Sequence, residues 1–183
     1  GGSTPRPVYE RLSELPYPWS EVDVFTVDER CVPADHPDSN QRMANEALLS
    51  KVEARLHPID AESCDAESYD QELGHRGRPR EIDLLLLGLG EDGHVASLYP
   101  GDPALEVTDR NAVRVERPGM PPPHPRVTMT MPVLSAARAA VFLVSGGSKR
   151  DALGRLMRGE DIPAARVSSD RVVVLATPDA APS

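Results

Sequence analysis

Aromatic side chains, cysteines and long apolar runs are all scarce in this chain of 183 residues, and each scarcity excludes a class of protein. No apolar run approaches the ~18 residues that a membrane-spanning helix needs, so no membrane protein is expected. The only cysteines, Cys31 and Cys64, match neither a metal-binding motif nor the disulfide framework of a small secreted domain. We therefore expect two reduced thiols in a cytoplasmic protein.

Basic residues are also fewer than acidic ones. The 20 Lys and Arg residues are outnumbered by 29 Asp and Glu residues, which gives a net charge of −9. With aromatic residues at only 4%, the chain lacks the basic stripe and the stacking surface of a nucleic-acid-binding protein. Because the overall field is negative, an anionic small substrate would have to be held by a few individual basic side chains.

The chain does contain a regular alternation of strand and helix patterns. Short runs rich in Val, Leu and Ile predict strands, and apolar residues at helical spacing predict the helices between them. Strands are expected over residues 22–27, 82–87, 112–115, 127–131, 139–144 and 171–176, and helices over 5–14, 39–56, 61–73 and 148–157. This order predicts an α/β fold with a largely parallel sheet, helices on both faces and a small antiparallel portion.

Local signals refine this outline. Thr4, Ser39 or Asp38, and Ser148 are candidate caps at the N-termini of three of the helices. The last helix should turn Leu153, Leu156 and Met157 toward the core, and residues 28–38 should form a loop.

Polar clusters follow the predicted strands, at the edge where open α/β sheets bind their ligands. These clusters are residues 28–30, 88–94 and 146–149. The glycine-rich start, residues 1–4, opens a helix and could hold an anion on its backbone amides, as could residues 146–149 with the added ammonium of Lys149. A cloning scar would also explain the glycines at the start, and an ordinary turn and helix cap would explain residues 146–149.

His94 is the most specific candidate for chemistry. It ends the turn Gly90-Glu91-Asp92-Gly93-His94, where glycines leave room for a substrate and an imidazole can act as a base near neutral pH. Asp92 would either orient the imidazole or shape the turn. A surface histidine beside solvated acids is the alternative.

Several other kinds of site are not supported. The remaining histidines, His36, His57, His75 and His124, show no paired metal-ligand spacing, so no metal site is expected. There is no Gly-x-Ser-x-Gly elbow of a serine hydrolase, no Walker loop and no Gly-x-Gly-x-x-Gly dinucleotide turn.

Five blocks of sequence occur in the order of a known family. They are Gly1-Gly2-Ser3-Thr4-Pro5; Asp28-Glu29-Arg30 with Val32-Pro33, His36 and Ser39-Asn40; the long glycine–histidine block over residues 87–101; Pro125-Arg126-Val127-Thr128-Met129-Thr130; and Gly146 with Lys149. Together they resemble the 6-phosphogluconolactonases, which share their sheet fold with the glucosamine-6-phosphate deaminases. Deaminases continue after the histidine with Phe-Asn-Glu-Pro, whereas Ser97-Leu98-Tyr99-Pro100 here resembles the lactonases.

The resemblance implies an enzyme of the oxidative pentose phosphate pathway that hydrolyses 6-phosphoglucono-δ-lactone to 6-phosphogluconate without a cofactor. His94 would activate the attacking water, with Asp92 and Asp28 completing the catalytic group. The residues expected to bind the substrate and its phosphate are Gly1, Gly2, Ser3, Thr4, Glu29, Arg30, Asn40, Arg126 and Lys149. Backbone amides of Gly1 and Gly2, or of Gly93, would receive the oxyanion.

The family also implies a strand, a helix and a strand before the glycine-rich start. Residues 1–183 are therefore expected to form a single, N-terminally incomplete domain, and a monomer. Two other functions stay open. One is a phosphosugar isomerase or deaminase, which would release ammonia from glucosamine 6-phosphate. The other is a non-catalytic fragment that binds a sugar phosphate, which a ligand would stabilise without turnover.

Overall fold

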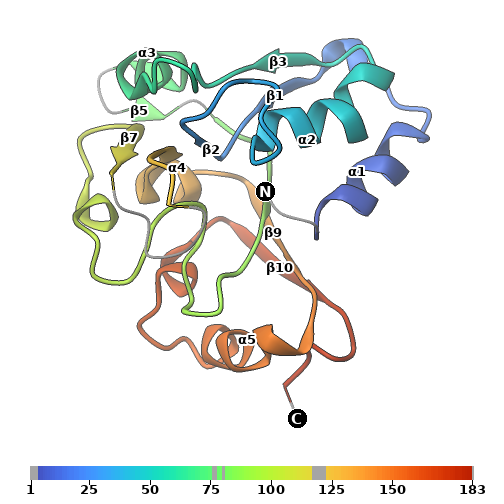
Figure 1. Cartoon of the computed structure of the whole chain (residues 1–183). Helices are drawn as coiled ribbons and strands as arrows, with labels where there is room; N and C mark the ends of the chain where they lie inside the picture. The colour runs from blue at the N-terminus through green and yellow to red at the C-terminus, as the bar shows by residue number, and fades with distance from the viewer. Residues whose placement is uncertain (1–3, 76–77, 80, 117–122, 183) are drawn as a thin grey trace.

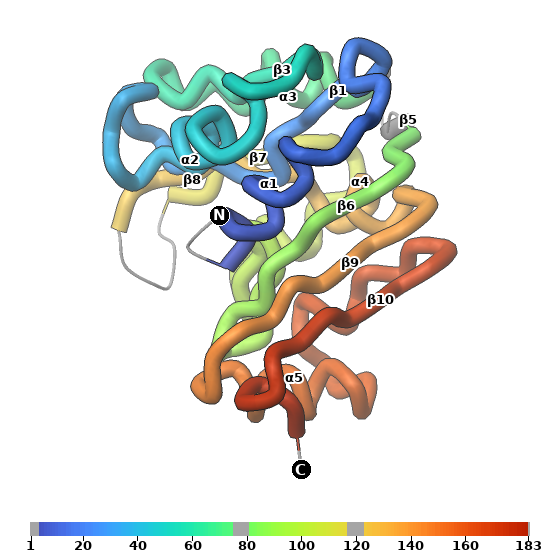
Figure 2. The backbone as a smooth tube through the Cα atoms, turned by 90° about the vertical axis from the view of Figure 1, so that its right-hand side faces the viewer, coloured from blue at the N-terminus to red at the C-terminus, as the bar shows by residue number. Residues whose placement is uncertain are grey.

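The computed structural model describes residues 4–75, 78–79, 81–116 and 123–182. Its largest parallel sheet has the strand order β10-β9-β6, formed by β6 (Leu84–Leu87), β9 (Ala139–Val144) and β10 (Arg171–Ala176). Figure 2 shows these three strands running side by side. The central strand, β9, buries Phe142 completely, which is why its sequence is a nearly continuous apolar run. A second parallel pair joins β1 (Asp23–Phe25) to β3 (Arg55–His57).

The antiparallel portion contains a strand that the sequence did not predict. Its order is β2-β8-β7, from β2 (Asp28–Arg30), β8 (Arg126–Met129) and β7 (Ala112–Val115). The prediction of a loop over residues 28–38 is therefore wrong at its start, because β8, about a hundred residues further on, supplies the hydrogen-bonding partner.

The predicted α/β class, with parallel strands and a less extended antiparallel portion, is confirmed. A short hairpin, β4 (Gly74–His75) with β5 (Arg78–Pro79), completes the strands of the described chain. The backbone hydrogen bonds of the described strands form four small sheets and not one continuous sheet.

The helices lie at the ends and sides of these sheets (Figure 1), and none that the structure describes crosses the face of β6, β9 and β10 that is turned to the viewer in Figure 2. They are α1 (Arg6–Ser13), α2 (Asn40–Ala47), α3 (Ala66–Glu72), α4 (Met131–Ser135) and α5 (Arg150–Met157), with 3-10 turns η1 (Trp19–Glu21), η2 (Leu49–Lys51), η3 (Pro103–Glu106), η4 (Gly147–Lys149) and η5 (Pro163–Arg166). Figures 1 and 2 place α2 and β3 at one end of the molecule and α5 at the other. None of the helices in the described ranges is both long and apolar enough to cross a bilayer.

Several helix ends differ from the sequence expectations, among them the start of α3, which lies at Ala66 and not at residue 61. The Ser39 hydroxyl caps α2 as predicted, accepting from the Arg42 N–H, but α2 stops at Ala47 because the chain must turn into β3. Thr4 and Ser148 make no capping hydrogen bond. Leu153 is buried as expected, whereas Met157 at the end of α5 is 68% exposed.

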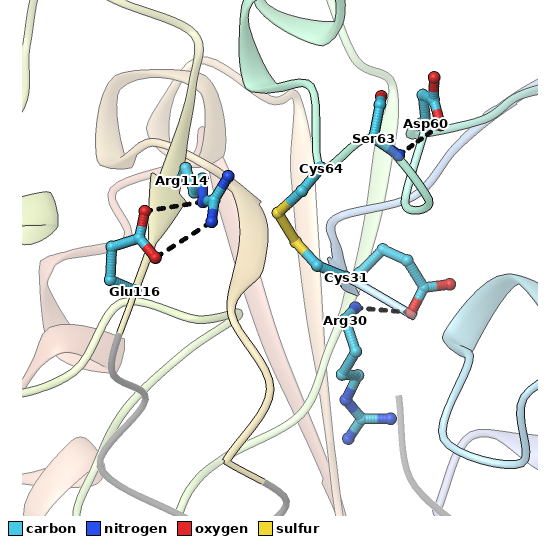
Figure 3. Close-up of a disulfide and its surroundings, with 8 residues drawn as sticks. Arg30, Cys31, Asp60, Ser63, Cys64, Arg114 and Glu116 are labelled. Atoms are coloured by element: carbon cyan, nitrogen blue, oxygen red, sulfur yellow. Dashed lines mark hydrogen bonds and ion pairs between the residues drawn. A yellow bond between two sulfur atoms is a disulfide. The ribbon is translucent and has the colours of Figure 1, made fainter. Parts of the chain in front are cut away.

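Cys31 and Cys64 form a disulfide, which corrects the expectation of two reduced thiols (Figure 3). Cys31 directly follows β2, and Cys64 lies in the turn before α3, with 5.1 Å between their Cα atoms. The two cysteines come together because the segment before α3 packs against the end of β2. Their spacing along the chain therefore could not reveal the pair. The Arg30 side chain extends away from the disulfide.

The disulfide predicts a measurable stabilisation. Removing a link across a sequence separation of 33 residues restores conformational entropy to the unfolded chain, and the expected loss is about 3–4 kcal/mol in the free energy of unfolding. Urea unfolding of the Cys31→Ser/Cys64→Ser variant against the oxidised protein measures it. Equal unfolding free energies for the two proteins would contradict the prediction.

Candidate active site

A cavity of about 450 Å³ lies where the carboxyl ends of β6 and β9 meet the antiparallel sheet. Its walls come from the end of β6, the turn that carries His94, the segment after β9, and strands β2 and β8. Seven of the sequence-predicted site residues line it: Thr4, Asp28, Arg30, Asn40, His94, Arg126 and Lys149. Gly1, Gly2 and Ser3 lie outside the described residues.

His94 is held in place by Asp92. The His94 Nδ1 atom lies 2.6 Å from Asp92 Oδ1, and the same oxygen accepts from the His94 backbone N–H at 3.0 Å. Because a carboxylate only accepts hydrogen bonds, Nδ1 carries the proton and Nε2 keeps a lone pair in the neutral ring. Burial raises the pKa of Asp92, but the bonds from His94, and the attraction of its ring when protonated, outweigh this and hold that pKa below its ordinary value.

The glycines of this turn are explained by the close approach of neighbouring atoms. A Cβ on Gly90 would lie 2.0 Å from His94 Nδ1, so the imidazole occupies the space of a side chain. Gly93 has a φ of +90°, and its Cβ would meet Ile162 at 2.8 Å. Its N–H donates to the Gly90 carbonyl at 3.0 Å. The Gly93 amide is thus used inside the turn, and the expectation that it would receive an oxyanion is not supported.

Asp28 connects the antiparallel sheet to the His94 turn. Its Oδ2 accepts from the buried Ser97 hydroxyl at 2.6 Å and lies 3.9 Å from Arg126 Nη1. The Asn40 side-chain amide donates to the Asp28 carbonyl at 2.9 Å. Arg126 is only 5% exposed, so a guanidinium and a carboxylate face each other in a largely desolvated wall of the cavity.

Glu29 does not line the cavity. Neighbouring residues of a strand point to opposite faces, so Glu29 faces away from the side that carries Asp28 and Arg30. Its fully buried carboxylate accepts hydrogen bonds at the start of α2 and from the chain beside it. The donors are the Ser39 hydroxyl and the backbone N–H groups of Arg30, Asn40 and Gln41, at 2.6–2.9 Å.

Of the two remaining basic side chains of the cavity, Arg30 is hydrogen-bonded and Lys149 lies near a carboxylate. Arg30 Nη1 donates to the Asp38 carbonyl at 2.7 Å and to Asn40 Oδ1 at 2.8 Å. Lys149 Nζ lies 3.9 Å from Glu91 Oε1. On the same rim, the hydroxyls of Thr4 and Ser145 are 2.9 Å apart, which ties the start of the described chain to the end of β9.

Sequence reasoning missed Tyr99, Ser97 and Ser145 as parts of this site. The Tyr99 ring centre lies 4.6 Å from that of His94, and burial, the largest effect, raises the pKa of its hydroxyl. Ser97 and Tyr99 stood inside the glycine–histidine block, but serine and tyrosine are too common in turns for the pattern alone to assign them. Ser145 follows a predicted strand, which was the only signal for it.

The fold and the cavity define an α/β protein in which a histidine shares a cavity with two arginines and a lysine, an arrangement suited to an anionic small molecule. The family model described as glucosamine-6-phosphate isomerases/6-phosphogluconolactonase matches residues 1–175. The chain therefore belongs to this family, and the resemblance read from the five sequence blocks is confirmed.

Individual relatives agree with the family model. A 6-phosphogluconolactonase of Synechocystis sp. is 45% identical over 175 residues, which are 89% of this chain and 71% of that protein. The crystal structure of the Thermotoga maritima 6-phosphogluconolactonase superposes with a TM-score of 0.86 at 34% identity, covering 96% of this chain and 82% of that one. The 6-phosphogluconolactonase structure from Trypanosoma brucei gives 0.84 at 28% identity, covering 98% and 82%. The expectation of an enzyme is confirmed.

The position of Glu29 generates a stability prediction. In Glu29→Gln the new amide group faces N–H donors whichever way it turns, so at least one buried donor loses its acceptor. We expect a loss of ~3 kcal/mol in the free energy of unfolding. Chemical denaturation followed by circular dichroism measures it.

Glu53→Gln is the matched control, because Glu53 is exposed. This variant should unfold almost as the parent protein does. Equal effects of the two substitutions would show that the buried carboxylate does not stabilise the start of α2.

Proposed function

We propose that this chain hydrolyses 6-phosphoglucono-δ-lactone to 6-phosphogluconate, the carboxylic ester hydrolysis of the oxidative pentose phosphate pathway. The observation that carries the proposal is His94, bound through Nδ1 to Asp92, inside the cavity that Arg126 and Lys149 also line. Membership of the family and the names of its relatives support the same reaction.

In the proposed mechanism His94 acts as the general base. Its Nε2 takes a proton from water as the water oxygen bonds to the lactone carbonyl carbon. The tetrahedral intermediate then collapses, the bond from carbon to the ring oxygen breaks, and the imidazolium returns the proton to that oxygen. Asp92 keeps the ring in the required tautomer and stabilises the transient imidazolium.

We propose that Lys149, Arg126 and Thr4 bind the phosphate, with Gly1, Gly2 and Ser3 of the same glycine-rich segment. An ammonium acts as a point charge on phosphate oxygens, and a guanidinium offers a planar pair of donors. Arg126 reaches the cavity from β8 and Lys149 from η4, so the two charges approach a ligand from different walls.

In this proposal Asp28 positions other side chains and does not itself react. Asp28 orients Ser97 and Arg126, while Asn40 and Arg30 present polar atoms to the hydroxyls of the sugar. Glu29 contributes through Arg30 and Asn40, whose backbone N–H groups it binds. A monomeric state, a cytoplasmic location and the absence of nucleic-acid or membrane partners stay predictions.

The role of His94 predicts a specific loss. His94→Ala removes the base but leaves the turn and the core, so folding should be intact while turnover of fresh lactone falls by ~10²–10⁴-fold. Proton release above the spontaneous hydrolysis of the lactone measures it.

His57→Ala is the control, because His57 pairs with Asp23 and Glu72 outside the cavity. Unchanged turnover in His94→Ala would remove this residue from the mechanism.

Ammonia release from glucosamine 6-phosphate would support the deaminase instead. Stabilisation by substrate without turnover would support a non-catalytic binder.

Phosphate binding by Lys149 predicts a change in KM. In Lys149→Ala we expect KM for the lactone to rise about tenfold or more, since a charge-assisted contact is lost. Glu91→Gln is the matched variant, because it removes the carboxylate that faces the same ammonium and should lower KM. Steady-state kinetics at constant ionic strength measure KM for the two variants. If KM is unchanged in both variants, the phosphate lies elsewhere.

A further inference from the structure

A second cluster of candidate ligands lies outside the cavity, on the loops that follow β2 and precede β8. The side chains of His36, Asp38 and His124 converge there, with one potential ligand atom of each lying within 4.8 Å of the others. His124 Nε2 is 3.1 Å from Asp38 Oδ2, and His36 Nδ1 is 3.8 Å from the same oxygen. The two imidazole rings meet edge to face, with 5.5 Å between their centres.

These separations are close to those of a bound ion. A tetrahedral zinc ion with bonds of about 2.1 Å holds its ligand atoms about 3.4 Å apart. Small side-chain rotations would bring the three ligand atoms to that distance, because each side chain is about one-third exposed (35%, 39% and 32%). One existing contact competes with the ion, since His36 Nδ1 accepts from the Asp38 N–H at 3.1 Å.

The donor set selects the kind of ion. Two imidazoles and one carboxylate suit zinc and similar transition metals, whereas Mg²⁺ and Ca²⁺ prefer oxygen ligands. Three protein ligands leave a coordination position for water. The net charge of −9 favours the approach of a cation.

We propose that His36, Asp38 and His124 form a binding site for a divalent transition-metal ion of the zinc type, separate from the catalytic cavity. The ion joins two segments that are far apart in the sequence. Spacing along the chain predicted no metal site because His36 and His124 become neighbours only when β2 pairs with β8.

This site is connected to the basic residues of the cavity. The Asp38 carbonyl accepts from Arg30, and His124 stands two residues before Arg126. An ion on the cluster therefore joins the loop that follows β2 to the loop that precedes β8, next to the strand ends that carry Arg30 and Arg126. Occupancy should raise the melting temperature, because the ion binds the folded chain and not the unfolded one.

Calorimetric titration of the whole chain with Zn²⁺, with the disulfide left oxidised, tests the proposal. We expect one saturable high-affinity site, a visible absorption band when Co²⁺ replaces Zn²⁺, and no comparable binding of Mg²⁺. His124→Asn and His36→Asn should each weaken the Zn²⁺ Kd at least tenfold, since removal of even an outer partner of a ligand costs about 10–100-fold. Asp38→Asn, which keeps the side-chain shape, should do the same.

His57→Asn is the matched control, because His57 also hydrogen-bonds two carboxylates but is not part of the cluster. It should leave the Zn²⁺ Kd unchanged. Circular dichroism confirms that each variant is folded before titration. Absence of saturable Zn²⁺ binding to the parent protein, or an unchanged Kd in the folded His36, Asp38 and His124 variants, would overturn the proposal.

Discussion

The antiparallel pairing of β2 with β8 is the constraint on which the site depends. It sets Asp28 opposite Thr128 and Arg30 opposite Arg126, and so brings two distant basic side chains to one wall of the cavity. Strands of three and four residues pair weakly by themselves. The pairing is reinforced by contacts at the end of β2, where the Cys31 N–H donates to the Pro125 carbonyl and the disulfide begins.

The buried carboxylate of Glu29 performs a related task on the other face of β2. By accepting from the start of α2, it fixes the helix that carries Asn40 relative to the strand that carries Asp28 and Arg30. The favourable electrostatics of a carboxylate at a helix N-terminus strengthen the connection. The acidic pair of the sequence is thus divided by the strand pleat into one residue for the cavity and one for the scaffold.

The basic groups of the cavity are already oriented before a ligand binds. Arg126 faces Asp28, Lys149 lies near Glu91, and Arg30 donates to a backbone carbonyl. A side chain held in this way loses less conformational freedom on binding an anion, so more of the electrostatic attraction is retained as affinity. The same neighbours oppose an anion by their own negative charge. An anion therefore binds this cavity best with its charge near the basic groups and away from these carboxylates.

Elements with a strong local pattern were predicted closely, and those that depend on distant partners were not. β7, β9 and β10 match their expected ranges because apolar runs and alternation are local properties. The predicted second helix was too long, since its apolar spacing continued past Ala47 into a segment that packs as β3 instead. β2 was expected to be a loop because nothing near it in the sequence reveals the strand that pairs with it.

The same distinction applies to the site. The histidine and its carboxylate partner could be inferred from the chain alone, because two residues on one glycine-framed turn meet through local geometry. The burial of Glu29, the disulfide and the cluster around Asp38 could not. The burial of Glu29, the disulfide and the cluster all depend on how whole segments pack against one another. That packing is set by burial and hydrogen bonding summed over the entire core, and no short stretch of sequence determines it.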